Sequence, residues 1–170
     1  AIGQLLCWAA LYYTFSSFVL PMMRELGWSK PLLMGAFTAG LAAWGLASYA
    51  AGAAIDRGHG RAVMTFGALL GAAACAAWSQ VHAPWLLYTS CVALGAAMAM
   101  TLYDPVFTIV THRYPTRYRE AITALTLVGG FASTLSFPAC VWLIAAVGWR
   151  GALLALAVCL LCVVAPLHAW

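Results

Sequence analysis

Long apolar runs, separated by short polar turns, occupy almost the whole chain. Six of these runs come close to the roughly 20 residues that a helix needs to cross a bilayer. They cover residues 3–23, 32–55, 62–81, 85–111, 121–147 and 151–168. The runs are apolar all round, whereas the strands of a membrane barrel alternate polar and apolar positions. We therefore predict an all-α integral membrane protein, a bundle of six transmembrane helices.

The composition supports a membrane protein and argues against other classes. Of the 170 residues, 65% are hydrophobic and 7% are charged, which is too little polar surface for a soluble domain. The net charge of +4 does not indicate nucleic-acid binding, because the few basic residues sit in turns, as at helix ends on a bilayer surface. We expect the lipid bilayer as a partner and no nucleic acid.

The basic residues also predict an orientation. An even number of helices puts both termini on one face, and the turns on that face hold Arg57, Arg61, Arg113, Arg117 and Arg119. The opposite turns hold Arg24, Lys30 and Arg150. By the positive-inside rule, this excess predicts cytoplasmic termini, and we expect a multi-pass protein of a bacterial inner (plasma) membrane.

Two further expectations follow from the turns. Trp28, Trp85 and Trp149 fall on the face opposite the termini, where we interpret them as interfacial anchors. Because the turns are short, we expect consecutive helices to be antiparallel neighbours.

A charged turn rich in glycine joins the second and third runs. Its sequence, residues 52–61, is Gly-Ala-Ala-Ile-Asp-Arg-Gly-His-Gly-Arg. It resembles the loop between helices 2 and 3 of the major facilitator superfamily, whose consensus is Gly-x-Leu-Ala-Asp-Arg-x-Gly-Arg-Arg. The matching positions are Gly52, Asp56, Arg57 and Arg61, while Ala54 replaces the leucine and the second glycine comes one place late, at Gly60.

The resemblance implies a secondary transporter that moves a small solute by alternating access. Members have two six-helix halves, each a 3+3 inverted repeat, with the substrate held between them. Residues 1–170 resemble the N-terminal half, so the C-terminal half, or a second copy of the chain, is the implied partner. The turn at Gly27-Trp28-Ser29 and the arginine cluster of residues 113–119 are similar to the monocarboxylate and organic-anion branch, which implies an organic anion as the substrate.

The resemblance also gives the charged turn a role. Asp56 would help to hold the cytoplasmic side closed by facing the other half, assisted by Arg57, Arg61 and Arg113. The alternative is a plain solvated turn.

Asp104 is the main candidate for chemistry inside the membrane. At about 1.5 Å per residue it lies about 13 Å along its helix from Arg113, within the hydrocarbon zone. An ionisable residue at that depth is a functional candidate, here for proton coupling or substrate contact. The alternative is a structural hydrogen bond to a hydroxyl of a neighbouring helix. Pro105 removes one backbone hydrogen bond beside it.

Several hydroxyl groups are further candidates for contact with the substrate or a proton. Tyr13, Ser16 and Ser17 share one helix face by their i, i+3, i+4 spacing, and Tyr103 and Thr126 complete the set. Hydrogen bonds between helices are the alternative. The expected bending points are Pro105, Gly129, Gly130 and Pro138.

No set of His, Asp and Ser lies at one depth, so we expect no enzyme. We also expect no cofactor and no metal, because the pair Cys159 and Cys162 lies in an apolar helix without a second ligand pair. The alternative function is a non-transporting six-helix scaffold that assembles with another membrane protein.

Overall fold

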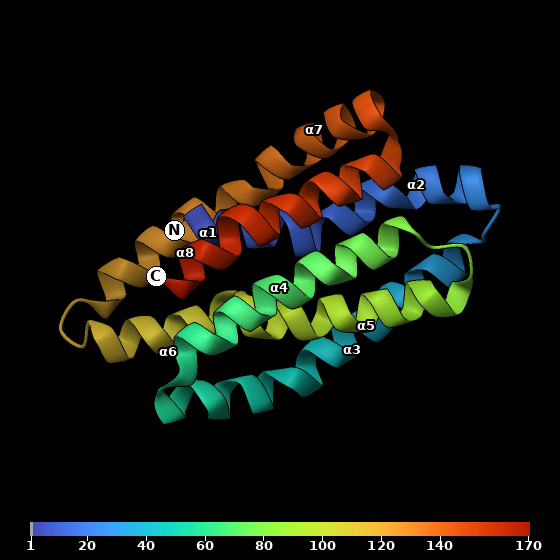
Figure 1. The fold of residues 1–170 in the computed structure, drawn as a ribbon. Helices are drawn as coiled ribbons and strands as arrows, with labels where there is room; N and C mark the ends of the chain where they lie inside the picture. Colours follow the sequence, from blue (N-terminus) through green and yellow to red (C-terminus); the bar gives the residue numbers. More distant parts are fainter. Residues whose placement is uncertain (1) are drawn as a thin grey trace.

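The computed structural model describes residues 2–170, apart from the side chain of Arg113, and is helical almost throughout (Figure 1). The first helix consists of α1 (Ile2–Cys7), the π-helical turn η1 (Trp8–Tyr13) and α2 (Thr14–Leu26). There follow α3 (Lys30–Ala54), the π-helical turn η2 (Ile55–His59), α4 (Gly60–Ser79), α5 (Pro84–Thr101) and α6 (Tyr103–Arg113). The chain ends with α7 (Tyr118–Cys159), η3 (Leu160–Val164) and α8 (Ala165–Ala169).

Within the described residues, four helical stretches are long and apolar enough to cross a membrane: Ile2–Leu26, Lys30–Ser79, Pro84–His112 and Tyr118–Ala169. The second and fourth are 50 and 52 residues long, and Figure 1 shows that each of them folds back on itself. The reversals coincide with Gly58 (φ 88°) and Gly148 (φ 72°). An L-residue with a side chain pays roughly 1–2 kcal/mol for this left-handed conformation, so both turns need glycine.

Helix α5 packs between α3 and α4, so the expectation that consecutive helices are neighbours is wrong for α3 and α4. The reason is a close crossing of α3 and α5 at two glycines. A Cβ on Gly95 would overlap the carbonyl oxygen of Gly40, and a Cβ on Gly40 would lie 2.7 Å from the carbonyl oxygen of Cys91. Without side chains the two backbones touch, which gains dispersion contacts where no hydrophobic force drives association.

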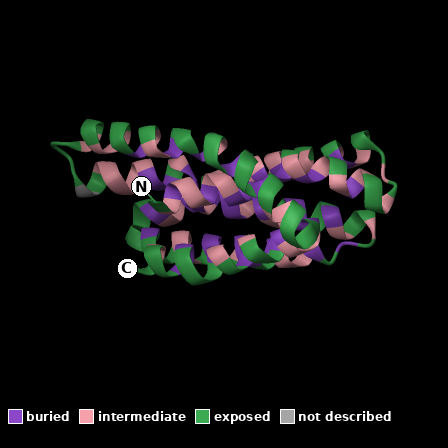
Figure 2. Ribbon diagram, turned by 90° about the horizontal axis from the view of Figure 1, so that it is seen from above, coloured by how far each residue is buried: buried purple, intermediate pink, exposed green. Residues whose placement is uncertain are grey.

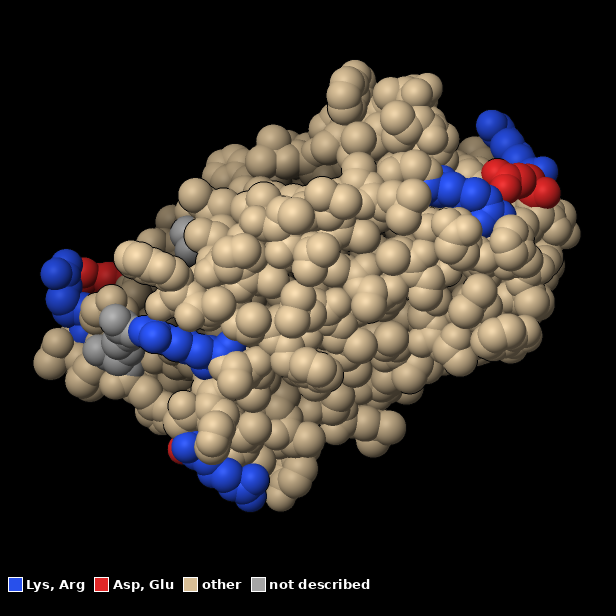
Figure 3. Space-filling model, in the orientation of Figure 1, with Lys and Arg blue, Asp and Glu red and all other residues tan. Residues whose placement is uncertain are grey.

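Charged side chains gather at the two ends of the bundle, and the long middle is uncharged on the face shown in Figure 3. Both termini lie at the same end as the Gly58 turn (Figure 1). Buried positions follow the inward faces of the helices, and exposed positions face outward (Figure 2). In a membrane, this exposed apolar surface faces lipid or another membrane protein.

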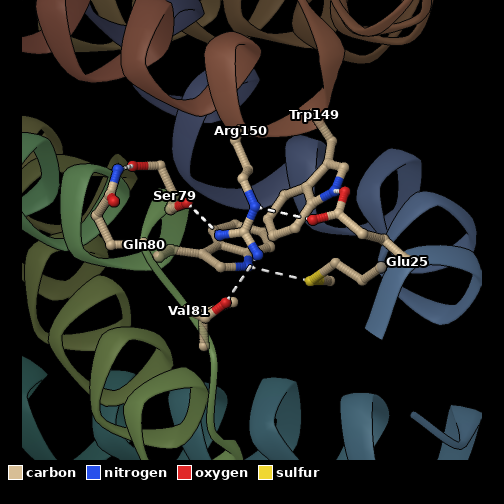
Figure 4. A network of polar contacts seen from close by, with 8 residues as sticks. Glu25, Ser79, Gln80, Val81, Trp149 and Arg150 are labelled. Atoms are coloured by element: carbon tan, nitrogen blue, oxygen red, sulfur yellow. Dashed lines mark hydrogen bonds and ion pairs between the residues drawn. The ribbon is translucent and has the colours of Figure 1, made fainter. Parts of the chain in front are cut away.

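A polar network fixes the end of the bundle opposite the termini (Figure 4). Arg150 donates to the carbonyl oxygens of Ser79 (2.6 Å) and Val81 (2.9 Å) and to a carboxylate oxygen of Glu25 (2.9 Å). Trp149 Nε1 donates to the other carboxylate oxygen of Glu25. Arg150 thereby satisfies carbonyls at the end of α4 and ties α2, α4 and the Gly148 turn together.

This network corrects the interpretation of Trp149 as an interfacial anchor. Its side chain is only 4% exposed, whereas Trp85 is 68% exposed. Trp149 is buried because it fills the space between α2 and the turn and carries the donor that Glu25 accepts.

The predicted helix over residues 85–111 is interrupted at Leu102 (φ −80°, ψ −155°), where α5 ends and α6 begins. Pro105 explains the position of the break, because it has no amide hydrogen to donate to the carbonyl of Thr101, four residues earlier. In α7, by contrast, the one residue with non-helical angles is Gly148. The bending at Gly129, Gly130 and Pro138 stays a prediction.

We predict that Gly95→Ala destabilises the protein by about 1–3 kcal/mol, because the new methyl group overlaps the backbone of α3. The matched control is Gly45→Ala, because a Cβ there meets nothing within 4 Å and alanine favours the helix by about 0.5–1 kcal/mol. Denaturation of the purified protein in detergent measures both. Equal stability of the two variants would contradict the close crossing.

We predict that Arg150→Gln destabilises the protein by about 1–3 kcal/mol, because the carbonyls of Ser79 and Val81 and the Glu25 carboxylate lose donors together. Arg24→Gln is the control: Arg24 lies at the same end of the bundle and is exposed, so the change is expected to stay within about 0.5 kcal/mol of wild type. The same denaturation assay decides, and an Arg150 variant as stable as the Arg24 variant would show that the network is dispensable.

Candidate functional site

A cavity of about 670 Å³ lies between α2 with the preceding η1 turn and the first half of α3. Its lining is mostly apolar and consists of Tyr12, Tyr13, Phe15, Ser16, Val19, Leu20, Met23, Lys30, Met34 and Phe37. Lys30 is the one charged side chain among these, and it stands at the start of α3, near the end of the bundle that holds the Arg150 network. Cavities of this size accept drug-sized ligands and combine apolar walls with a few polar groups.

The first helix contains the π-helical turn η1, and the carbonyl of Ala9 in this turn accepts from two side chains. Thr14 Oγ1 donates to it at 2.6 Å, and Ser136 Oγ of α7 donates to it at 3.1 Å. Thr14 and Ser136 are both buried. Turns of this kind are frequent at functional sites, and here the turn carries Tyr12 and Tyr13, which line the cavity.

Aromatic rings connect the cavity to the interruption at Leu102. This aromatic cluster consists of Trp8, Tyr12, Tyr13, Trp44 and Tyr103. The centroid of Trp8 lies 5.4 Å from that of Tyr12, 6.1 Å from that of Trp44 and 4.8 Å from that of Tyr103. The cluster therefore joins the first helix to α3 and α6 through edge-on and tilted contacts.

Gly129 of α7 makes room for this cluster. A Cβ at Gly129 would overlap the hydroxyl group of Tyr103. The glycine that the sequence suggested as a bending point thus accommodates Tyr103, a role that became visible only when the two helices were placed together.

Of the predicted hydroxyl candidates on the first helix and α7, some line the cavity and the others lie outside it. Tyr13 and Ser16 line the cavity, and Ser16 Oγ donates to the carbonyl of Tyr13 at 2.9 Å. Ser17 is half-buried outside the lining. Thr126 Oγ1 donates at 3.0 Å to carbonyls of its own helix, those of Ile122 and Thr123. In this structure Thr126 therefore serves its own backbone.

Asp104 is exposed and stands in the first turn of α6, immediately after the interruption. A carboxylate at a helix N-terminus is favoured by the helix dipole, so the break supplies an environment that an unbroken helix would not. Asp104 does not line the cavity. Its neighbour Tyr103 belongs to the aromatic cluster, so Tyr103 packs against Trp8 whereas Asp104 is exposed.

The charged turn lies at the opposite end from Lys30, with Asp56, Arg57 and Arg61 exposed. Among the side chains that the structure describes, Asp56 forms no ion pair, and the side chain of Arg113 lies outside the described part. Gly52 lies within α3, and the left-handed residue of the turn is Gly58.

Lys30, Trp8 and Gln4 are the residues that sequence reasoning missed. Lys30 was counted only for its charge, since nothing local shows that it borders a cavity. Gln4, an amide in an apolar run, was a signal for a buried hydrogen bond. Within residues 2–170, no three His, Cys, Asp or Glu side chains converge on a point that would hold a metal ion.

The sequence profile of the Major Facilitator Superfamily matches residues 1–170, the whole of the chain. No protein of the curated collection matches it.

Proposed function

The chain belongs to the Major Facilitator Superfamily, a family of membrane transporters, and we propose that it moves a small organic anion across the membrane by alternating access. The observation that carries the substrate class is the cavity of about 670 Å³ with Lys30 as its one charged lining residue. An ammonium group at the edge of an apolar chamber fits a molecule with an apolar body and a negatively charged group.

We propose that the chain crosses the membrane six times, as the N-terminal half of a transporter with a 3+3 inverted repeat. A straight helix of 50 residues would be about 75 Å long, far more than the roughly 30 Å of the hydrocarbon core. The left-handed residues Gly58 and Gly148 divide the two long stretches into arms of membrane length, which supports six spans.

The other wall of the substrate site then comes from a C-terminal six-helix half or from a second copy of the chain. The cavity lies on one side of the first helix and α3 and is partly open, as expected of a site shared between two halves. We place the termini in the cytoplasm of a bacterial cell, with the protein in the inner membrane.

In this arrangement the charged turn closes the cytoplasmic side. Asp56, Arg57 and Arg61 are exposed at the end of the bundle that carries the termini, so they are free to meet the other half. Arg113 belongs to the same proposed gate. Opening this contact and closing the end near Lys30 would alternate access to the cavity.

We further propose that Asp104 couples transport to protons. It is a carboxylate about two-thirds of the way along the membrane-crossing stretch Pro84–His112, within the hydrocarbon zone, where an ionisable group is costly unless it serves a function. Its position after the helix break leaves it exposed toward the surface of this half, where a proton, the substrate or the other half has access.

We predict that Lys30→Gln raises the KM for phenylacetate by about 10- to 100-fold, because a charge-assisted bond of about 1.5–3 kcal/mol is lost. Uptake by the full-length protein in proteoliposomes measures this, after subtraction of the leak into protein-free liposomes. Lys30→Arg keeps the charge and should retain most of the uptake, and Arg24→Gln, outside the cavity, should leave it unchanged.

Uncharged phenylacetamide provides the contrast in ligand charge. In the wild-type protein it should inhibit the uptake of labelled phenylacetate much less than unlabelled phenylacetate does. In Lys30→Gln the amide and the acid should inhibit equally well. Equal competition by acid and amide in wild type would refute the anion assignment.

We predict that Asp104→Asn abolishes accumulation driven by an imposed pH gradient but leaves exchange of labelled for unlabelled phenylacetate at equal pH. The asparagine cannot take up a proton, yet it preserves the size of the side chain. Glu120→Gln is the matched control, because Glu120 is an exposed carboxylate in the first turn of α7, paired with Arg117. If accumulation in the Asp104 variant equals that of the control, Asp104 has no part in coupling.

A further inference from the structure

The interruption before α6 leaves the carbonyl of Thr101 without an amide donor from residue 105. In a continuous helix the carbonyl of Thr101 accepts from the amide of residue 105, but residue 105 is proline and has no amide hydrogen. Thr101 is fully buried, so its carbonyl cannot form a hydrogen bond with solvent water instead. A buried carbonyl without a donor is strongly unfavourable.

Gln4 supplies the missing donor from another helix. Its Nε2 donates to the Thr101 carbonyl at 2.6 Å, across 97 residues of sequence. The side chain of Gln4 is only 3% exposed, and an amide placed so deeply in an apolar bundle indicates a specific role. The protein keeps this contact although Gln4 Oε1 is left buried without a partner among the described residues.

The contact also lies next to the aromatic cluster. Trp8 is one turn after Gln4 on the first helix and so shares its face, and its ring lies 4.8 Å from that of Tyr103, the first residue of α6. The first helix therefore holds the break from both sides, with Gln4 before it at Thr101 and Trp8 after it at Tyr103.

We propose that Gln4 is a positioning residue that takes the place of the Pro105 amide and holds the helix open at Leu102, which sets the placement of Tyr103 and Asp104. This placement of Tyr103 and Asp104 serves transport, a role that rests on the proposed function. Gln4 itself acts through the Thr101 carbonyl and needs no contact with the substrate.

A double-mutant cycle on the full-length protein tests the exchange of donors. Gln4→Met removes the donor at similar length, and Pro105→Ala restores an amide at residue 105. We expect Gln4→Met to lower the apparent unfolding temperature by about 5 °C in the wild-type background and by less than half as much in the Pro105→Ala background. Gln80→Met is the control at the other glutamine of the chain, which is exposed and donates only to the neighbouring Ser79 Oγ, and it should shift this temperature much less than Gln4→Met.

Hydrogen exchange over residues 102–108 tests the placement without any transport assay. We expect these amides to exchange at least about tenfold faster in Gln4→Met than in wild type or Gln80→Met, because a segment with a lost contact opens locally more often. Exchange in segments remote from the break, such as the end of α7, should not change.

Each outcome decides a separate claim. An equal loss of stability from Gln4→Met in both backgrounds refutes the exchange of donors, and unchanged exchange over residues 102–108 refutes the positioning role. Slower transport of phenylacetate per folded molecule in Gln4→Met would connect the placement of Tyr103 and Asp104 to function. A wild-type rate in this variant would show that transport does not depend on that placement. If the wild-type protein fails to transport phenylacetate, the proposed substrate falls, while the cycle and the exchange data still decide the role of Gln4.

Discussion

Backbone hydrogen bonding without water governs this structure. In the hydrocarbon core, a carbonyl that its helix does not satisfy must find a donor within the protein. At each of three departures from the regular helical ladder, a backbone carbonyl accepts from at least one side chain of another helix. The Ala9 carbonyl at the η1 turn takes Thr14 and Ser136, the Thr101 carbonyl takes Gln4, and the carbonyls at the end of α4 take Arg150.

These compensating bonds determine which helices stay together. Ser136 ties α7 to the first helix, Gln4 ties the first helix to α5, and Arg150 ties the Gly148 turn to α4. Each bond spans at least 71 residues of sequence, and two of the donors belong to otherwise apolar runs. A chain with so few charged residues thus gains its specific polar contacts where its helices are irregular. Two of these irregular segments are the η1 turn beside the cavity and the break before Asp104.

The sequence was sufficient for the features that depend on one-dimensional patterns. Apolar runs of membrane length, a charged turn at residues 52–61 and the family all follow from the order of residues, and the family profile covers residues 1–170. The packing order of the helices was not predictable in this way. It depends on Gly40 meeting Gly95, and two glycines among the 15 in the chain become a crossing only once their helices are placed.

The candidate site divides along the same line. Tyr13 and Ser16 were identified from their spacing on one helix face, and they do line the cavity. Lys30 was not identified, because the cavity arises between α2 and α3 and neither helix shows it alone. The break at Leu102 was signalled by Pro105, but the partner that makes the break tolerable lies 97 residues away.

The distribution of charge constrains how such a half can work. Lys30 and Asp104 are separated along the bundle, because Lys30 begins α3 near the Arg150 end whereas Asp104 stands about two-thirds of the way along Pro84–His112, toward the other end. A substrate anion and a proton would therefore bind to different helices, and the aromatic cluster is the packed material between them. Coupling between two such sites requires an element with two arrangements that both sites bias. The interrupted helix is the element of this half that is suited to that role, since its first turn carries Asp104 and its first ring, that of Tyr103, contacts Trp8 beside the cavity wall.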